Sequence, residues 1–192
     1  MAKRTKTDSA AVNPRDFWPT PMEAVPPLVE RLKVTDPNGL IIEPCAGDGR
    51  LADALTANGL KVRIMSDIEP RRDDVRRGDA SKLPFAPTHL VVTNPPWSRD
   101  LLEPILHNMV GKTNAWLLLP LDYLANLWMA PFVPYVNQIV PLGRVSWLNN
   151  GKGGYENSAW LRFNWAQRNI VAARKPKPRT RKASIPNPQG DS

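Results

Sequence analysis

Short apolar runs bounded by turn residues alternate along the chain with segments whose apolar residues recur every three or four positions. Runs of the first kind are typical of buried strands, and segments of the second kind of amphipathic helices. The pattern predicts strands at residues 39–42, 61–66, 75–78, 89–93, 114–119, 138–148 and 158–165. It predicts helices at residues 21–33, 51–58 and 100–110.

Residues at the ends of these segments fit their assignment. Thr20 is the expected N-cap of the first helix, and Pro26 and Pro27 should make its first half irregular. Gly59 is placed to end the second helix. Strands that alternate with helices imply a parallel sheet, and such sheets bind ligands beyond the carboxyl ends of their strands. The sequence therefore predicts an α/β fold with its site at that edge.

Composition agrees with one folded domain. The chain has 192 residues, of which 42% are hydrophobic and 23% charged, close to ordinary globular values. Cys45 is the single cysteine, so an intramolecular disulfide is excluded, and no His/Cys cluster has zinc-ligand spacing. We therefore expect no metal site.

Charge is concentrated at the two ends. The first ten residues carry a net +2 and residues 174–192 a net +5, which leaves +1 of the total +8 for the rest. These segments are polar, and the second is rich in proline, which predicts disordered basic arms at 1–12 and 174–192 around a domain at 13–173. Such arms either bind nucleic-acid phosphates or only increase solubility.

The first residues, 1–13, are polar and contain no apolar signal core. The most apolar stretch, residues 115–121, is far shorter than the ~18 residues that a membrane span needs. We expect no membrane partner and a cytoplasmic protein.

A glycine-bearing loop, Glu43-Pro44-Cys45-Ala46-Gly47-Asp48-Gly49, follows the first predicted strand. Gly47 and Gly49 either make a tight turn or let a ligand approach the backbone. The full dinucleotide fingerprint and the Walker lysine are absent, which disfavours phosphate binding. Carboxylates instead follow three strands, as Glu43 and Asp48, then Asp67, then Asp79. This lining suits a ligand with a cationic centre, an amine and ribose hydroxyls.

The tetrapeptide Asn94-Pro95-Pro96-Trp97 directly follows the apolar run 90–93. Paired prolines fix the backbone, so that the Asn94 amide oxygen and a nearby backbone carbonyl can converge as two acceptors for one NH2 group. Trp97 offers a face on which a planar base can stack. The competing interpretation is a strand stop followed by a core tryptophan.

Taken together, five segments resemble the motif series of class I S-adenosylmethionine-dependent methyltransferases. They are residues 17–21, 43–49, 66–70, 78–80 and 94–97. The whole chain resembles small phage-type DNA N6-adenine methyltransferases. The resemblance implies a Rossmann-like α/β fold, with a mostly parallel central sheet, an antiparallel last strand and helices on both faces.

The resemblance also implies roles for particular residues. S-adenosylmethionine would be held at its methionine end by Glu43, Pro44, Cys45, Ala46, Gly47, Asp48 and Gly49, with help from Thr20 at the carboxylate. Asp67 would bind the ribose hydroxyls and Asp79 the adenine amino group, and Ile68, Ala80 and Asn94 would also belong to the cofactor site. Asn94, Pro95, Pro96 and Trp97 would hold the target base.

The implied reaction is direct attack of the adenine exocyclic amine, in DNA, on the sulfonium methyl group. Cys45 is not needed as a nucleophile, and neither His89 nor His107 is expected to be catalytic. Trp147, Trp160 and Trp165 are expected to pack in the core or at an edge, and the loop 149–154 is either a hairpin tip or a substrate contact. Two alternatives stay open: a methyltransferase acting on RNA or a protein amide, and an inactive nucleic-acid-binding module.

Overall fold

A computed structural model describes residues 14–147 and 153–169. The predicted basic arms and most of the loop 149–154 lie outside the described residues. Within the described ranges, no helix is both long and apolar enough to cross a membrane.

The described residues form a seven-stranded sheet with the order β3-β2-β1-β4-β5-β7-β6. All pairs are parallel except those that β7 makes with β5 and β6. The strands are β1 (Leu40–Glu43), β2 (Lys61–Asp67), β3 (Arg76–Arg77), β4 (Leu90–Thr93), β5 (Asn114–Pro120), β6 (Val136–Gly143) and β7 (Ser158–Phe163). This confirms the predicted mostly parallel sheet with an antiparallel last strand.

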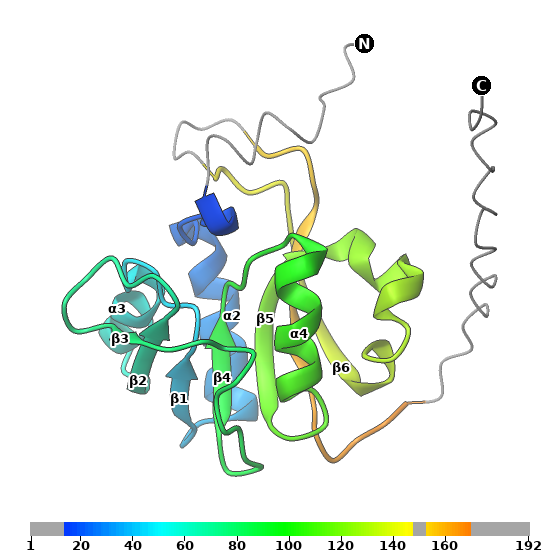
Figure 1. Cartoon of the computed structure of the whole chain (residues 1–192), viewed down its shortest axis with the longest axis horizontal. Helices are drawn as coiled ribbons and strands as arrows, with labels where there is room; N and C mark the ends of the chain where they lie inside the picture. Colours follow the sequence, from blue (N-terminus) through cyan, green and yellow to red (C-terminus); the bar gives the residue numbers. More distant parts are fainter. Residues whose placement is uncertain (1–13, 148–152, 170–192) are drawn as a thin grey trace, which may run out of the picture.

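Helices cover both faces of the sheet (Figure 1). One face carries α2 (Val25–Thr35) and α3 (Arg50–Ala57), and the other carries α4 (Arg99–Met109). Shorter 3-10 turns are η1 (Pro14–Asp16), η2 (Met22–Ala24), η3 (Leu121–Ala125), η4 (Leu127–Met129) and η5 (Val133–Tyr135).

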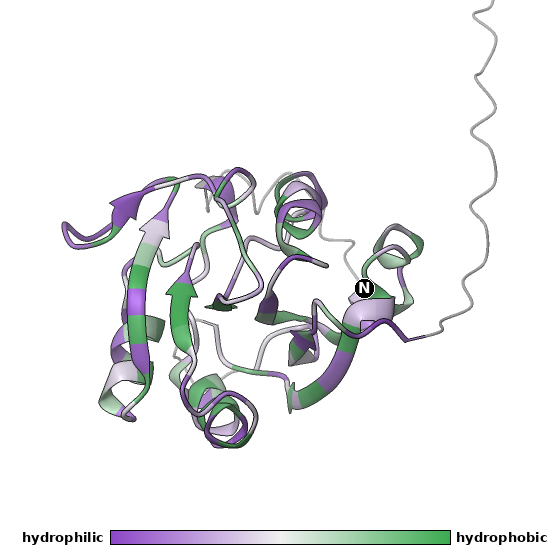
Figure 2. Cartoon of the chain, turned by 90° about the horizontal axis from the view of Figure 1, so that it is seen from below, coloured by the Kyte–Doolittle hydropathy of each residue, from purple (hydrophilic) through white to green (hydrophobic). Residues whose placement is uncertain are grey.

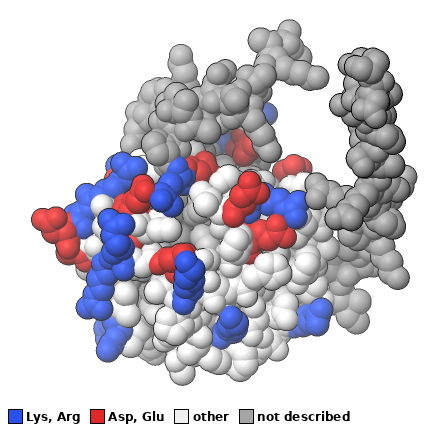
Figure 3. Space-filling model, viewed as in Figure 1, with Lys and Arg blue, Asp and Glu red and all other residues white. Residues whose placement is uncertain are grey.

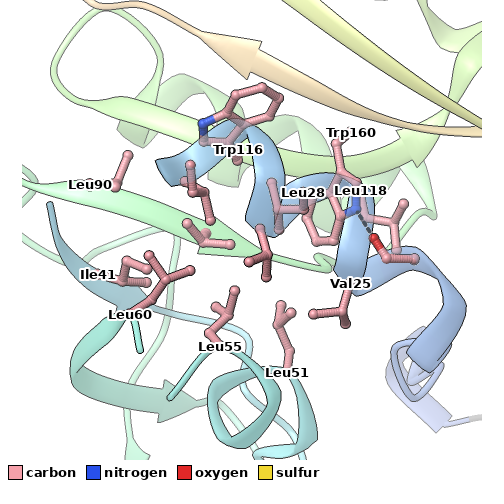
Figure 4. Close-up of a cluster of buried hydrophobic side chains, with 14 residues drawn as sticks. Val25, Leu28, Ile41, Leu51, Leu55, Leu60, Leu90, Trp116, Leu118 and Trp160 are labelled. Atoms are coloured by element: carbon pink, nitrogen blue, oxygen red, sulfur yellow. Dashed lines mark hydrogen bonds between the residues drawn. The ribbon is translucent and has the colours of Figure 1, made fainter. Parts of the chain in front are cut away.

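Alternating strand residues pack into two separate cores. On the α2 and α3 face, Trp116, Leu118 and Trp160 are fully buried, and the Trp160 indole N–H donates to the Ala24 carbonyl at 2.8 Å (Figure 4). On the α4 face, Leu117 and Leu161 are fully buried. Figure 2 shows the strands changing from hydrophobic in the middle of the sheet to hydrophilic at the β3 edge. The central strands are therefore held by apolar burial on both sides.

Two details of the predicted elements are wrong. Thr20 is not an N-cap: Pro21 precedes η2, and Ala24 precedes α2, without a side-chain cap. The strand predicted at 138–148 ends at Gly143, because its φ of 71° departs from the extended backbone of a strand. The sequence pattern predicted no element between β5 and β6, where the structure has η3, η4 and η5.

A nearly buried ion pair ties α2 to the far part of the sheet. Arg162 on β7 donates to the Asp36 carboxylate at 3.0 Å, and the two side chains are 9% and 11% exposed. Thr35 and the Trp116 indole also donate to Asp36, at 2.6 Å and 3.4 Å. Asp36 ends α2, so its carboxylate joins that helix to β5 and β7.

We predict that Asp36→Ala lowers the free energy of unfolding by about 3–5 kcal/mol, because it leaves the Arg162 guanidinium buried without its partner. Chemical denaturation measures this loss. Glu103→Ala, which breaks the exposed pair of Glu103 with Arg99 on α4, is the control and should change stability little. Equal effects of the two substitutions would contradict the role given to Asp36.

Candidate functional site

A cavity of about 230 Å³ opens beyond the carboxyl ends of β1, β2 and β4. Its volume is slightly below the roughly 300–1,000 Å³ of small-molecule pockets. Residues 15–20 form one part of its wall, and α4 contributes Asp100, Leu101, Pro104 and Ile105. The cavity thus lies where a parallel sheet is expected to bind a ligand.

Most of the site residues predicted from the sequence meet at this cavity. Those that line it are Thr20, Pro44, Cys45, Ala46, Asp48, Asp67, Ile68, Asp79, Ala80, Asn94 and Pro96. Glu43, Gly47, Gly49, Pro95 and Trp97 do not line it. Four of these five residues are buried and adjacent in sequence to lining residues: Glu43, Gly47, Gly49 and Pro95. They would affect a ligand by shaping the backbone of the lining residues or from just behind the cavity wall.

The loop between β1 and α3 is shaped by its two glycines. Gly47 and Gly49 have φ values of 54° and 76°, which residues with a Cβ rarely adopt. The Gly47 N–H donates to Asp67 at 2.8 Å, and the other oxygen of the same carboxylate accepts from the Glu69 N–H at 2.8 Å. Asp67 therefore fixes the loop after β1 as well as the turn after its own strand.

Glu43 ends β1 with a side chain that is almost fully buried. The residue is 1% exposed, and Oε2 has no hydrogen-bond partner in the described structure. Burial, and then the negative charges of Asp48 and Asp67, raise the pKa of this carboxyl well above its usual value. A buried acid with one unpartnered oxygen, next to residues that line a cavity, is the kind of group that a ligand amine or cation would satisfy.

The pKa values of two other groups at the cavity are shifted in opposite directions. Burial, followed by the charge of Asp67, raises the pKa of the Cys45 thiol, which keeps it protonated. Hydrogen bonds from Ser81 and Lys82 lower the pKa of Asp79, which keeps its carboxylate charged. The Asp79 carboxylate is thus available as an acceptor, whereas Cys45 is a poor nucleophile.

Asn94 lies at the end of β4 with its amide held in one orientation. Its Nδ2 donates to the Trp18 carbonyl at 2.8 Å. A carbonyl can only accept, so the amide nitrogen must face Trp18, and Oδ1 is then directed elsewhere as an acceptor. No hydrogen bond to this Oδ1 occurs among the described residues. Because Asn94 lines the cavity, the structure places one oriented acceptor at its wall.

Trp97 packs differently from the predicted stacking platform. Its indole N–H donates to the Leu118 carbonyl at 2.9 Å, and its ring meets that of Trp147 edge-on at a centroid distance of 4.7 Å. Its side chain touches both hydrophobic cores. The ring thus has a structural role in joining the two cores, and base stacking on it stays a prediction.

Sequence reasoning missed part of the wall formed by residues 15–20. Arg15 pairs with Glu69, and the Arg71 guanidinium lies 3.9 Å from the centre of the Phe17 ring. The Asp16 carboxylate accepts from the Trp97 and Ser98 backbone amides, at 2.6 Å and 2.5 Å. The motif at 17–21 marked the segment, but no periodicity in the sequence marks Asp16.

The remaining candidates lie outside the cavity. The His89 Nδ1 accepts from the Ala86 N–H, and the exposed His107 packs edge-on against Phe132. Trp160 is a core residue as predicted, whereas Trp165 is 40% exposed. Among the described residues, no three acidic, histidine or cysteine side chains are grouped to hold a metal ion.

No protein-family model matches the sequence, and no curated protein does either. Solved structures do share the fold. A putative RNA methyltransferase from Pyrococcus horikoshii matches 86% of this chain and 100% of its own, with a TM-score of 0.61 and 16% identity. A putative class I S-adenosylmethionine-dependent methyltransferase from Listeria monocytogenes matches 86% of this chain, with a TM-score of 0.51 and 12% identity. A modification subunit of a putative type I restriction enzyme from Vibrio vulnificus YJ016 matches 85%, with a TM-score of 0.53 and 12% identity.

The chain spans 65% of the length of the Listeria protein and 48% of the Vibrio subunit. Sequence identities this low, together with these TM-scores, show a common fold but not a common activity or substrate. The predicted resemblance to class I methyltransferases is therefore confirmed at the level of the fold.

We predict that Glu43→Gln stabilises the protein without ligand at neutral pH, because it removes an ionisable group whose charged form is disfavoured by burial. A raised pKa means that folding must either bury the charge or take up a proton, so the penalty is absent below the ordinary glutamate pKa and grows as the pH rises above it. Thermal melting at pH 4 to 8 measures the difference, which should shrink toward pH 4. Glu30→Gln, on the exposed face of α2, is the control. A pH-independent difference would contradict the burial of an ionisable Glu43.

Proposed function

We propose that this chain, which has the fold of class I methyltransferases, transfers a methyl group from S-adenosylmethionine to the exocyclic N6 amine of adenine in DNA. The observation that carries the proposal is the Asn94 amide, oriented by the Trp18 carbonyl at the wall of a cavity rimmed with carboxylates. The coarser activity, N-methyl transfer from this cofactor, rests on the fold and the cavity. The DNA target rests on the Asn-Pro-Pro-aromatic resemblance and on charge.

The residues around the cavity fit the cofactor chemically. The unpartnered Oε2 of Glu43 and the nearby Asp48 suit the amine of the methionine end. Asp67, at the end of β2, retains lone pairs beyond those used by Gly47 and Glu69, and these can accept from ribose hydroxyls. Asp79 can accept from the adenine amine. When bound, the cofactor supplies an electrophilic methyl group on a positively charged sulfur, and the carboxylates favour that charge.

The Asn94 amide oxygen and the Pro95 carbonyl would accept hydrogen bonds from the two N–H groups of the target amine. These hydrogen bonds would favour a pyramidal nitrogen, whose lone pair could form the new bond to the methyl carbon in exchange for that carbon's bond to sulfur. The methylated nitrogen, then cationic, would lose one of its protons to water. Alignment of amine, methyl and sulfur can supply roughly 7–11 kcal/mol of the acceleration. No covalent intermediate with the enzyme is needed, which agrees with the protonated Cys45.

Charge supports a nucleic acid as the substrate. Lys and Arg, with some Asp and Glu among them, gather on the side of the molecule that carries β2 and β3 (Figure 3). Arg71 also lines the cavity. A further net +5 resides in residues 174–192. The amine of adenine is paired inside a duplex, so the base must be flipped out or the strand must be single. One of the structures with this fold is described as a restriction-modification subunit, and another as a putative RNA methyltransferase.

The decisive experiment offers radiolabelled S-adenosylmethionine with duplex DNA, single-stranded DNA, RNA or protein as the acceptor. The proposal expects label in DNA and N6-methyladenine in its nucleoside digest. Label in RNA or protein alone would keep the cofactor and overturn the DNA target. Cofactor binding without transfer to any acceptor would favour a binding module.

We predict that Asn94→Ala lowers turnover far more than it lowers cofactor affinity. The amide oxygen should bind more strongly as the target nitrogen becomes cationic, so its removal acts on the transition state and should reduce turnover by at least about 100-fold. Steady-state kinetics and calorimetry measure the two quantities. Asn58→Ala, at the exposed end of α3, is the matched control and should turn over normally. Wild-type turnover by Asn94→Ala would show that the tetrapeptide is only a strand stop.

We predict that removal of residues 174–192 weakens DNA binding and flattens its dependence on salt, because it removes a net +5. For each DNA phosphate that this segment neutralises, its removal should reduce the slope of log affinity against log salt by about 0.9. Fluorescence anisotropy between 50 and 300 mM salt, roughly the range over which this electrostatic contribution dominates, measures the slope. An unchanged slope would limit this segment to a role in solubility.

A further inference from the structure

We infer that Asp16 is a positioning residue for methyl transfer: its carboxylate fixes the turn from Asn94 to Ser98, and so makes the N-terminal wall of the cavity part of the target site. The inference rests on the function proposed above and concerns a residue outside the motif series. Asp16 lies in η1, which Figure 1 shows near the edge of the sheet that carries the cavity.

The contacts of Asp16 converge on the turn after β4. Its Oδ2 accepts from the Trp97 N–H at 2.6 Å and from the Ser98 N–H at 2.5 Å. Pro95 and Pro96 have no N–H, so these amides are the first two donors that the chain offers after Asn94. A charged acceptor forms stronger hydrogen bonds than a neutral one. The Asp16 carboxylate therefore fixes the position of the backbone next to the Pro95 carbonyl.

The same carboxylate also stabilises the start of α4. Ser98 is the N-cap of this helix and makes no side-chain cap of its own. The negative charge of Asp16 lies at the helix N-terminus, where unpaired N–H groups favour an anion. The cap is thus supplied by a residue 82 positions earlier in the chain. This contact therefore ties Asp16 to the start of α4, a helix whose residues also line the cavity.

Asp16 also controls the orientation of Asn94 through a second contact. Its Oδ1 accepts from the Trp18 indole N–H at 3.1 Å, and the carbonyl of the same Trp18 accepts from the Asn94 amide. One carboxylate therefore constrains both groups that would accept hydrogen bonds from the target amine: the Asn94 side chain through Trp18 and the Pro95 carbonyl through Trp97. A shift of about 1 Å in such groups can cost roughly 100-fold in rate.

The segment around Asp16 is fastened to the cofactor side as well. Arg15 pairs with Glu69, and Phe17 lies under Arg71 and against Gly47, where a Cβ would collide with its ring. Arg15 and Asp16 have φ values of 57° and 58°, a left-handed conformation that is unfavourable for such residues. These contacts hold the strained turn, as is common where backbone strain serves a site. The same short segment therefore contacts both the cofactor side of the cavity and the turn that would bind the target amine.

The test compares Asp16→Asn and Asp16→Ala with the wild type. In Asp16→Ala we expect turnover to fall by about 10- to 100-fold, with a smaller change in cofactor affinity. In Asp16→Asn one amide oxygen can still accept from both backbone amides, so turnover should be partly rescued. Asp122→Asn is the matched control. The negative charges of Asp16 and Asp122 both raise the pKa of Tyr123, but only Asp16 accepts hydrogen bonds from the backbone of the turn.

A readout independent of activity is amide hydrogen exchange at Trp97 and Ser98, followed by NMR. Both amides should exchange at least about tenfold faster in Asp16→Ala, with an intermediate rate in Asp16→Asn and no change in the control. Thermal melting checks that each variant folds, and if Asp16→Ala does not, Asp16→Asn carries the comparison.

The possible results separate the two proposals. Unchanged exchange and turnover in Asp16→Ala would overturn the inference. Equal losses of turnover and cofactor affinity without rescue by Asp16→Asn would also overturn it, in favour of a purely structural role. If the wild type transfers no methyl group to any acceptor, the proposed function fails and the positioning role with it, whereas the exchange rates still show whether Asp16 holds the turn.

Discussion

The carboxyl ends of β1 and β4 lie side by side because these strands are parallel neighbours, and the order of the strands reverses between them. From β1 the chain moves outward to β2 and β3, and from β4 it moves to the other side, to β5. The connections after β1 and β4 therefore leave in opposite directions and open a crevice between them. The carboxylates after β1 and β2 and the amide after β4 can share one cavity only for this reason.

The buried ionisable side chains are of two kinds: those that pair with each other and stabilise the fold, and those with an oxygen that lacks a hydrogen-bond partner. Asp36 and Arg162 satisfy each other between α2 and β7 and belong to the first kind. Glu43 belongs to the second, since it is as deeply buried but has an unpartnered oxygen and a raised pKa. Keeping such a group lowers stability, and the proposed cofactor amine gives a chemical reason for it.

The N-terminal segment links the two halves of the proposed reaction. Residues 15–20 form a wall of the cofactor cavity, and from the same few residues come the carboxylate that holds the Trp97 amide and the carbonyl that orients Asn94. The geometry of the proposed target site therefore depends on a segment that precedes the first strand by some twenty residues. Precise positioning of acceptors in this way is how an enzyme without a covalent intermediate can accelerate methyl transfer.

The sequence by itself determined most of the strands and helices, the mostly parallel sheet and a part of the cavity lining, since most of the site residues predicted from it lie at the cavity. Apolar periodicity, glycine at Gly47 and Gly49, and polar residues just after strands are local signals, and the carboxyl ends of neighbouring parallel strands must meet. Only the tertiary structure decided which residues face the cavity. Trp97 packs between two cores, β6 stops at Gly143, and Asp16 reaches a turn 81 positions away. Contacts between residues so far apart depend on how the elements pack, and a single sequence carries no periodic trace of them.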